Sequence, residues 1–492
     1  MFGKEGYMIR LLCKKRTALI ASVLFFITSS AGFGFDLHIN GDFRKTISPE
    51  VLRGYAYPVE SDARFQAGIS LLETVPLFTD VYRIEIDYAG GLKILEDNNL
   101  ADRFCGWMLL FHKNSVDFTT GKKTYRRVRS IRIWGEELQS SQLRIWIAWE
   151  GLPELRRELA RFAELHQLSF DILEVPSIDS KLTSAARGGG TLPDLCMVQS
   201  DYLPALTESR VLQRLDYISL PDILQKGSDA FTRDGHSWAV PFYFDTQLVF
   251  YNPRLIEEVP AAPVPHADWT LDQFEQLCKA LLQKGISPIT WNAYSAYWLI
   301  PFQIGFGKES VLNADNSITI DDTATRRALS YITGLQEKGY LDIRERDGMM
   351  SRFLSGDVAM ILSGSYSIPE FEKLGIPFAV APYPYNEAED SYISPLLEFK
   401  AFAITRKTKQ PILARRLVEY LSGQGVQQRF CGAVSKLPAN TEAWKVTELQ
   451  NPYSDAFFAS YRIGTVIPPE DSYKIYENTM WKLLRFAITG KM

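Results

Sequence analysis

The sequence has few of the residues from which metal and catalytic sites are usually built. Its five histidines are scattered along 492 residues and show no metal-ligand spacing. Its five cysteines form no CxxC pair, and no GxSxG nucleophile elbow is present. These absences argue against a metalloenzyme and a serine hydrolase. We therefore predict a protein that is not an enzyme, with no catalytic residues, no metal and no cofactor.

The chain also lacks a basic surplus. Its formal net charge is −4, and residues 1–34 carry five basic residues and one acidic residue, so the remainder has a net charge of −8. Such a surface does not suggest a nucleic-acid partner. The one basic stretch, Lys122–Arg129, is interpreted as a solvated strand face.

Long apolar runs are missing as well. The N-terminal run Thr17–Thr28 is short for a membrane span. Arg10 and Lys14–Arg16 precede it, and the small residues of 29–34 follow, which is the layout of an export signal. We predict cleavage near Ala31–Gly34, with an uncleaved anchor as the alternative. Cys13 precedes the run, so no lipid-attachment cysteine follows it, and a periplasmic or secreted protein is expected.

The remaining four cysteines lie mostly in apolar surroundings. These are Cys105, Cys196, Cys278 and Cys431. Buried free thiols are favoured over a disulfide framework, although an exported protein could form bridges.

Residues 35–142 show short alternating or apolar runs and no long amphipathic helix. Runs at 81–86, 106–111 and 128–134 are separated by turn residues. This spacing predicts a β-sandwich. The segments Val116–Thr119 and Arg129–Trp134 resemble strands of jelly-roll carbohydrate-binding modules, so the domain is expected either to bind a glycan or to dock a partner.

From residue 143 onward, strands alternate with helices. A strand at 143–150 turns through Gly151 into an amphipathic helix, and strands at 170–175 and 192–198 follow. This order predicts a parallel sheet with right-handed crossovers. Ligands of such sheets sit at the carboxyl ends of the strands. The side chains expected there are Trp149, Glu150, Asp201 and Tyr202.

Later segments supply further helices. Thr270 and Gln273 form a capping box at the start of one of them. Amphipathic patterns predict two more at 325–338 and 410–421, and a last one at about 474–488.

A series of landmarks in the same order resembles the extracellular solute-binding proteins of the maltose-binding-protein type. The likeness spans about 143–492. The landmarks are Leu143–Leu165, Leu192–Leu195, Trp238–Pro241, Leu248–Pro253, Phe353–Gly364, Ala401–Thr405 and Lys436–Asn440. The resemblance implies an α/β fold of two lobes joined by a hinge. One lobe would hold about 143–245 and 398–441, and the other about 248–395 and 445–492.

The resemblance also implies a function. We expect an exported receptor that captures a carbohydrate, of the oligosaccharide class, between its lobes and presents it to the membrane permease of an ATP-driven importer. Hinge closure would be the signal that the partner reads. The alternatives are a ligand sensor for a membrane signalling partner and a polysaccharide-active enzyme. A glycosidase would need two carboxylates at a set separation.

Two further site residues follow from the resemblance: Asp245 matches a cleft acid, and Tyr366 matches a stacking aromatic. Two more aromatic candidates are Trp298, for which core packing is the alternative to binding, and Tyr473, which precedes the final helix within reach of the cleft. Aromatic faces suit the C–H-rich faces of sugars, and carboxylates accept strong hydrogen bonds from hydroxyls. We expect Asp245 and Tyr366 to face the cleft rather than a core, so that replacing either weakens binding and hardly changes ligand-free melting.

Overall fold

The computed structural model describes most of the chain. The described residues are 35–47, 56–61, 64–112, 115–138, 142–220, 222–313 and 315–489. The expected export signal at 1–34 lies outside them. Among the helices of this described part, none combines the length and the apolarity that crossing a bilayer requires.

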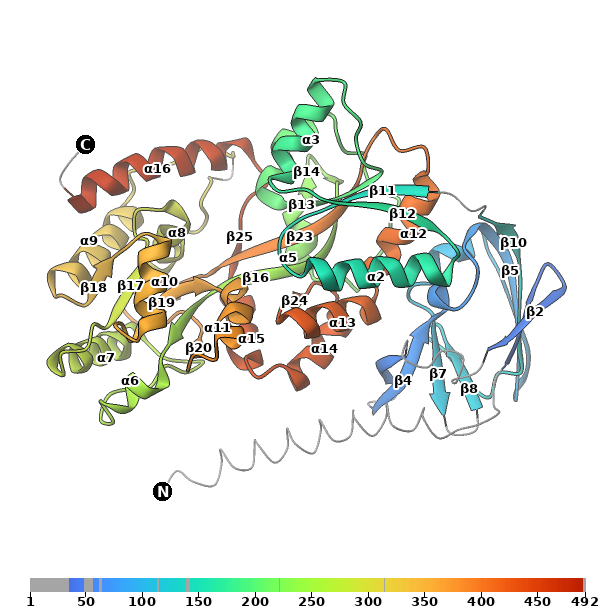
Figure 1. The fold of residues 1–492 in the computed structure, drawn as a ribbon, viewed down its shortest axis with the longest axis horizontal. Helices are drawn as coiled ribbons and strands as arrows, with labels where there is room; N and C mark the ends of the chain where they lie inside the picture. Colours follow the sequence, from blue (N-terminus) through green and yellow to red (C-terminus); the bar gives the residue numbers. More distant parts are fainter. Residues whose placement is uncertain are drawn as a thin grey trace.

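The N-terminal β region consists of two five-stranded sheets (Figure 1). One sheet has the order β2-β1-β10-β5-β6 and the other β3-β4-β7-β8-β9. The bounds are β1 (Phe35–Ile39), β2 (Asp42–Ile47), β3 (Tyr57–Ser61), β4 (Arg64–Ser70), β5 (Phe78–Tyr88), β6 (Gly91–Glu96), β7 (Met108–His112), β8 (Ser115–Thr119), β9 (Thr124–Tyr125) and β10 (Ser130–Glu137), with short turns η2 (Leu71–Glu73) and η3 (Leu100–Arg103). The all-β prediction for this part is confirmed.

Alternation along the strands builds the core of this region. In β1, Phe35, Leu37 and Ile39 are fully buried while the residues between them are not. Tyr88 of one sheet meets Tyr125 of the other edge-to-face, with ring centroids 5.3 Å apart. The two sheets therefore share one hydrophobic core.

The next segment begins lobe 1 with the predicted order of strands and helices. Strands β11 (Gln142–Ile147), β12 (Ser169–Glu174) and β13 (Leu195–Gln199) alternate with helices α2 (Leu152–Leu165) and α3 (Ile178–Arg187). β11 pairs in parallel with both other strands. Gly151, at the N-cap of α2, has φ of 73° and a Cβ there would lie 2.9 Å from the Phe430 ring. Glycine is needed at that turn for both reasons.

Two long strands cross from lobe 1 into lobe 2. Strands β16 (Val240–Tyr251) and β23 (Leu396–Ile404) pair antiparallel in the middle of an eleven-stranded sheet. Eight of its strands follow the order β12-β11-β13-β23-β16-β19-β17-β18, while β20 and β24 also pair with β16 and β25 pairs with β23. Lobe 2 contains β17 (Ile289–Trp291), β18 (Leu341–Ile343), β19 (Met360–Gly364) and β20 (Ala379–Ala381). Figure 1 shows β16 and β23 running side by side through the centre of the molecule, between the two lobes.

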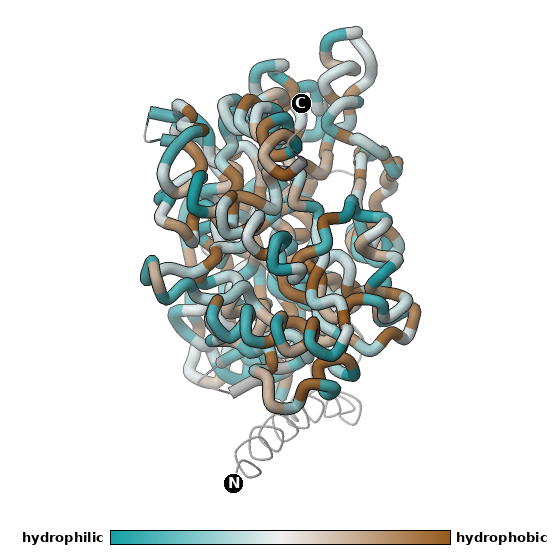
Figure 2. The backbone as a smooth tube through the Cα atoms, turned by 90° about the vertical axis from the view of Figure 1, so that its left-hand side faces the viewer, coloured by the Kyte–Doolittle hydropathy of each residue, from teal (hydrophilic) through white to brown (hydrophobic). Residues whose placement is uncertain are grey.

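Amphipathic helices cover the sheet. Figure 2 shows hydrophobic and hydrophilic residues alternating along the helical segments. The helices named below are α7 (Leu271–Gln283), α8 (Ala296–Gly305), α9 (Thr323–Glu337), α12 (Pro411–Leu421), α13 (Gln424–Val434), α14 (Thr441–Gln450) and α16 (Asp471–Thr489). Thr270 and Gln273 form the predicted capping box of α7. The α/β two-lobe prediction is confirmed.

The remaining elements are short or lie beside these helices. They are η4 (Ser200–Tyr202), α4 (Leu203–Glu208), α5 (Gln225–Ala230), β14 (Thr232–Arg233), β15 (His236–Ser237), α6 (Pro253–Glu257), α10 (Arg346–Ser355), η5 (Ser365–Ser367), α11 (Ile368–Leu374), β21 (Tyr385–Asn386), β22 (Ser391–Tyr392), β24 (Leu437–Pro438), α15 (Ser454–Ile463) and β25 (Thr465–Val466). Cys105 is half-buried, Cys196, Cys278 and Cys431 are buried, and all four are free thiols, as the sequence favours.

Two arginines attach the β region to lobe 1. Arg416 of α12 lies 2.9 Å from Asp102 and 2.8 Å from Glu419, and its Nε donates to the carbonyl of Phe78. Arg429 of α13 bridges Glu158 of α2 and Glu73 of η2. Only 1% of Arg416 is exposed. Ion pairs and hydrogen bonds of low solvent exposure therefore join the β region to lobe 1.

His166, after α2, provides a test of acid stability. Its ring packs against Phe162, with centroids 4.5 Å apart, and neither ring nitrogen has a hydrogen-bond partner among the described residues. Burial, with a smaller contribution from Lys45, lowers the pKa of His166 to about 3. The folded chain therefore keeps this ring neutral at pH values where the unfolded chain, with a histidine pKa of about 6.5, takes up a proton.

We expect His166→Phe to flatten the acid limb of the stability curve. A histidine with a lowered pKa contributes stability above about pH 6.5 that is lost as the pH falls toward the folded pKa. Between pH 7 and pH 5 the wild type should lose about 2 kcal/mol more than the variant. Denaturant unfolding at both pH values measures this. His266→Phe, at an exposed position, is the control, and equal slopes for His166→Phe and wild type would contradict the assignment.

Candidate functional site

The predicted polar residues gather where strands of lobe 1 end. Trp149 and Glu150 follow β11, and Asp201 and Tyr202 lie in η4 directly after β13. Trp149 and Tyr202 both line a cavity of about 620 Å³. Because parallel strands bring their carboxyl ends to one edge of a sheet, these side chains come from distant segments to one place. The expected juxtaposition is present, and the role of these residues in binding stays a prediction.

Asp245 lies at the centre of a buried charge cluster. Its Oδ1 is 2.7 Å from the Nζ of Lys436 and accepts a 2.7 Å hydrogen bond from Ser365 of lobe 2. Its Oδ2 is 3.7 Å from the Nζ of Lys400 and has no hydrogen-bond partner among the described residues. Burial opposes ionisation, but Lys436 and Lys400 outweigh it and lower the pKa of Asp245. The carboxylate is therefore charged and joins both lobes.

The exposure of Asp245 corrects one expectation. Only 1% of the residue is accessible to solvent, so it is enclosed in this conformation and does not face open space. The reason is its position on β16, opposite Glu398 of β23 in the strand register, where residues of both lobes surround its side chain. An effect on ligand-free stability must therefore be expected when Asp245 is changed.

Two further charges complete the cluster. Glu150 lies 3.4 Å from the Nζ of Lys436, and Glu398 lies 3.5 Å from the Nζ of Lys400. Burial raises the pKa of Glu398, against the pull of Lys400. Three carboxylates thus surround two ammonium groups, a set that can accept hydrogen bonds from a neutral, hydroxyl-bearing ligand.

Asp201 forms a second acidic position that links lobe 1 to α16. Its Oδ2 lies 2.9 Å from the Nζ of Lys474, whose ammonium also stands 5.0 Å from the ring centroid of Tyr202. Its Oδ1 is buried and lacks a partner within the described part of the chain. Burial raises the pKa of Asp201. Oδ2 of this carboxylate therefore has a hydrogen-bond partner within the described part of the protein, and Oδ1 does not.

Tyr366 reaches the same cluster from lobe 2. It lies in η5, directly after β19, and is half-buried. Burial, together with the charge of Glu398, raises the pKa of Tyr366 to about 12. A smaller contribution comes from Asp245. Tyr366 is therefore a neutral aromatic side chain close to the carboxylates of the hinge.

Two predicted residues are placed in the core. Trp298 in α8 is 7% exposed and packs edge-to-face on Tyr297, and Tyr473 in α16 is 2% exposed and packs against Tyr476. The structure does not bring their rings to a surface. Trp298 therefore takes the core-packing alternative, and Tyr473 is buried in α16, because large aromatic side chains serve cores as readily as binding sites.

Sequence reasoning missed the basic half of the cluster. Lys400 lies within the apolar strand 396–404, two residues after Glu398, and Lys436 directly precedes β24. Lys436 is completely buried and Lys400 is 4% exposed. A signal did exist, because a charged pair inside an apolar strand is rarely buried without partners.

Known proteins match the part of the chain that forms the two lobes. A model of the family described as bacterial extracellular solute-binding protein matches residues 159–453. The maltodextrin-binding protein MdxE of Bacillus subtilis (strain 168) is 24% identical over 288 residues, which cover 57% of this chain and 68% of that protein. The galactooligosaccharide-binding protein of the same organism is 22% identical over 316 residues, covering 61% and 73%.

Solved structures share the fold. The GacH receptor of Streptomyces glaucescens superimposes with a TM-score of 0.63 at 21% identity, covering 72% of this chain and 95% of that one. The maltotriose-binding protein of Thermus thermophilus, bound with maltotriose, gives 0.60 at 20%, covering 70% and 94%. The ABC substrate-binding protein Lmo0181 of Listeria monocytogenes, in complex with cycloalternan, gives 0.62 at 16%, covering 72% and 95%.

Proposed function

The chain belongs to the bacterial extracellular solute-binding proteins of the maltose-binding type, and from this premise we propose that it captures an oligosaccharide between its two lobes without altering it. Maltodextrin, maltotriose and galactooligosaccharide are the ligands in the names of its relatives. The ligand we propose is therefore a short neutral oligosaccharide.

One observation carries this proposal. Asp201 Oδ1 and Asp245 Oδ2 are buried carboxylate oxygens without a hydrogen-bond partner in the described part of the chain. Buried polar atoms are normally satisfied, so each such oxygen needs an explanation. Sugar hydroxyls donate to carboxylates, and a hydrogen bond to a charged group contributes about 1.5–3 kcal/mol. A hydroxyl-rich ligand that enters when the lobes part would supply the two missing donors.

Aromatic side chains support the same ligand class. Trp149 and Tyr202 line the cavity beside the carboxyl ends of β11 and β12, and Tyr366 lies across the hinge. The cavity volume of about 620 Å³ is in the range of ligand sites, about 300–1,000 Å³. An aromatic ring buries the apolar face of a sugar while the carboxylates hold its hydroxyls.

Delivery to the permease of an ATP-driven importer is the second part of the proposal. One structural relative, Lmo0181 of Listeria monocytogenes, is an ABC substrate-binding protein. Hinge closure along β16 and β23 would present the loaded form to the membrane partner. Export through residues 1–34, and the division into a β domain at 35–142 and a solute-binding domain at 143–492, belong to the same proposal.

A thermal-shift screen against an oligosaccharide library tests the function. A ligand that binds only the folded chain stabilises it by about 2.7 kcal/mol at a hundredfold excess over Kd. We expect a neutral oligosaccharide to raise Tm and to be recovered intact by chromatography. A library in which no oligosaccharide raises Tm would contradict the proposal, and recovery of shortened products would reveal an enzyme.

Asp201→Asn should weaken oligosaccharide binding about tenfold or more, which is about 1.4 kcal/mol. The amide removes the charge from the hydrogen bond at Oδ1. Ligand-free melting should change little, because the side chain of Lys474 is 39% exposed and stays solvated. Calorimetric titration measures the affinity, and Asp234→Asn, 83% exposed at its side chain, is the control. An unchanged Kd for Asp201→Asn would remove this residue from the site.

A further inference from the structure

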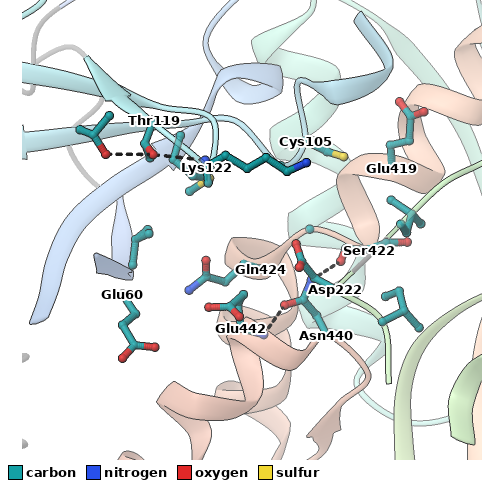
Figure 3. Close-up of a pocket in the computed structure, with 18 of the residues that line it drawn as sticks. Glu60, Cys105, Thr119, Lys122, Asp222, Glu419, Ser422, Gln424, Asn440 and Glu442 are labelled. Carbon is teal, nitrogen blue, oxygen red and sulfur yellow. Dashed lines mark hydrogen bonds between the residues drawn. The ribbon is translucent and has the colours of Figure 1, made fainter. Parts of the chain in front are cut away.

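A second cavity lies between the β region and lobe 1, away from the hinge. Its volume is about 630 Å³. One wall comes from β7, β8 and the β8–β9 turn, and the other from the ends of α12, α13 and α14 (Figure 3). Among the described residues that line it, none is aromatic. Its chemistry therefore differs from that of the proposed oligosaccharide site.

Direct bonds hold the two walls in place. Gln424 at the start of α13 donates a 2.9 Å hydrogen bond to the carbonyl of Pro58, and Lys445 of α14 lies 2.9 Å from Glu60. The buried Arg416 fixes the same two regions nearby. Asn440, the N-cap of α14, donates hydrogen bonds to the carbonyl of Ser422 and to the side chain of Gln427, so α14 packs with α12 and α13 on the lobe 1 side of the hinge strands. Both walls of the cavity therefore lie on that side.

Most charges around this cavity are compensated within the protein. Glu60 and Glu442 pair with Lys445, and Glu419 pairs with Arg415 and Arg416. Lys122, Lys123 and Asp222 differ from them. Across the part of the chain that the structure describes, the side chains of these three residues have neither an ion pair within 4 Å nor a hydrogen bond, although the ammonium of Lys123 lies 5.5 Å from the ring centroid of Tyr125.

Lys122 and Asp222 have opposite signs and stand on opposite walls. Figure 3 shows Lys122 extending over the cavity from the β region, with Asp222 on the facing wall beside Asn440 and Glu442. Burial and the negative charge of Glu442 raise the pKa of Asp222. Lys445 opposes this rise only in part, so a cation next to the half-buried Asp222 would offset the cost of its burial. The exposed ammonium of Lys122 is available to an anion on the opposite wall.

We propose that this cavity binds a small zwitterion, a free amino acid or short peptide, with its ammonium group at Asp222 and its carboxylate at Lys122. Lys123, which also lines the cavity, adds positive charge on the carboxylate side. Gln424 and Asn440 offer amide groups to the polar middle of the ligand. A neutral sugar satisfies neither charge, so the cavity and the hinge site select different ligands.

Thermal shift and calorimetric titration of the full protein test the proposal. The probes are the proteinogenic amino acids one at a time and the dipeptide alanylalanine. At least one probe should raise Tm, and its N-acetylated and amidated derivatives should not. Asp222→Asn and Lys122→Ala should each weaken binding of that probe about tenfold, and both should respond to an oligosaccharide as the wild type does.

Matched controls are Asp347→Asn and Lys409→Ala, which alter exposed charges elsewhere and should bind the probe normally. Three results would overturn the proposal: no probe raises Tm, the probe binds equally well to both cavity variants, or Asp201→Asn abolishes its binding and so places it at the hinge. Stabilisation by inorganic phosphate but by no zwitterion would overturn it too. These results concern the amino-acid and dipeptide probes alone, so they can be interpreted even if no oligosaccharide binds.

Discussion

Asp245→Asn is expected to lower the free energy of unfolding of the ligand-free protein by about 3–5 kcal/mol. The substitution removes the negative charge between Lys436 and Lys400, whose side chains are 0% and 5% exposed. Breaking a buried ion pair leaves an uncompensated charge in a poorly polarisable interior. Glu150, 43% exposed at its side chain, replaces only part of the lost attraction. Scanning calorimetry should record a clearly lower Tm.

The double variant Asp245→Asn/Lys436→Met separates charge from packing. Replacing both members of a buried pair costs much less than removing one, so the double variant should recover a large part of the lost stability. Both variants should bind oligosaccharide at least tenfold more weakly, because each lacks the Asp245 acceptor. If Asp245→Asn melted at the Tm of the wild type, the buried cluster would not stabilise the hinge.

Arg416→Met should destabilise the protein by a similar amount, about 3–5 kcal/mol. It removes one cation from Asp102, Glu419 and the carbonyl of Phe78 together. Arg415 remains beside both Asp102 and Glu419, so we expect the loss to lie at the lower end of this range. The β region and lobe 1 share this contact, so calorimetry should resolve an earlier transition for the β region.

Arg103→Met is the matched control for this substitution. Arg103 also pairs with an aspartate, Asp97, but the two side chains are 53% and 48% exposed. An exposed pair contributes about 0–1 kcal/mol, so this variant should melt nearly as the wild type does. Equal melting of the two arginine variants would contradict the interface described for Arg416.

The sequence predicted what depends on local pattern. Alternation indicated the strands of the β region, and the period of α2 with Gly151 before it indicated the start of lobe 1. The order of β11, β12 and β13 placed Glu150 and Asp201 at one edge of the sheet. In each case the decisive residues lie close together along the chain or follow a general rule of parallel sheets.

Local sequence patterns could not predict the contacts between residues that lie far apart in the chain. Lys436 lies 191 residues from Asp245 in the chain, and nothing near either residue states that they meet. The same limit applies to aromatic residues. Trp298 and Tyr366 are both aromatic residues of lobe 2, but Trp298 is 7% exposed and packed in α8 while Tyr366 is only half-buried beside the hinge. Burial, which distinguishes them, is a property of the whole fold.

A crystal structure of the protein with the oligosaccharide that gives the largest thermal shift tests the central claim most directly. We predict sugar density between the lobes, with ligand hydroxyls donating to Asp201 Oδ1 and Asp245 Oδ2 at oxygen–oxygen distances of about 2.5–3.0 Å, and Trp149, Tyr202 or Tyr366 against a sugar ring. Sugar bound on the β region, with both carboxylate oxygens still unpartnered, would contradict the account.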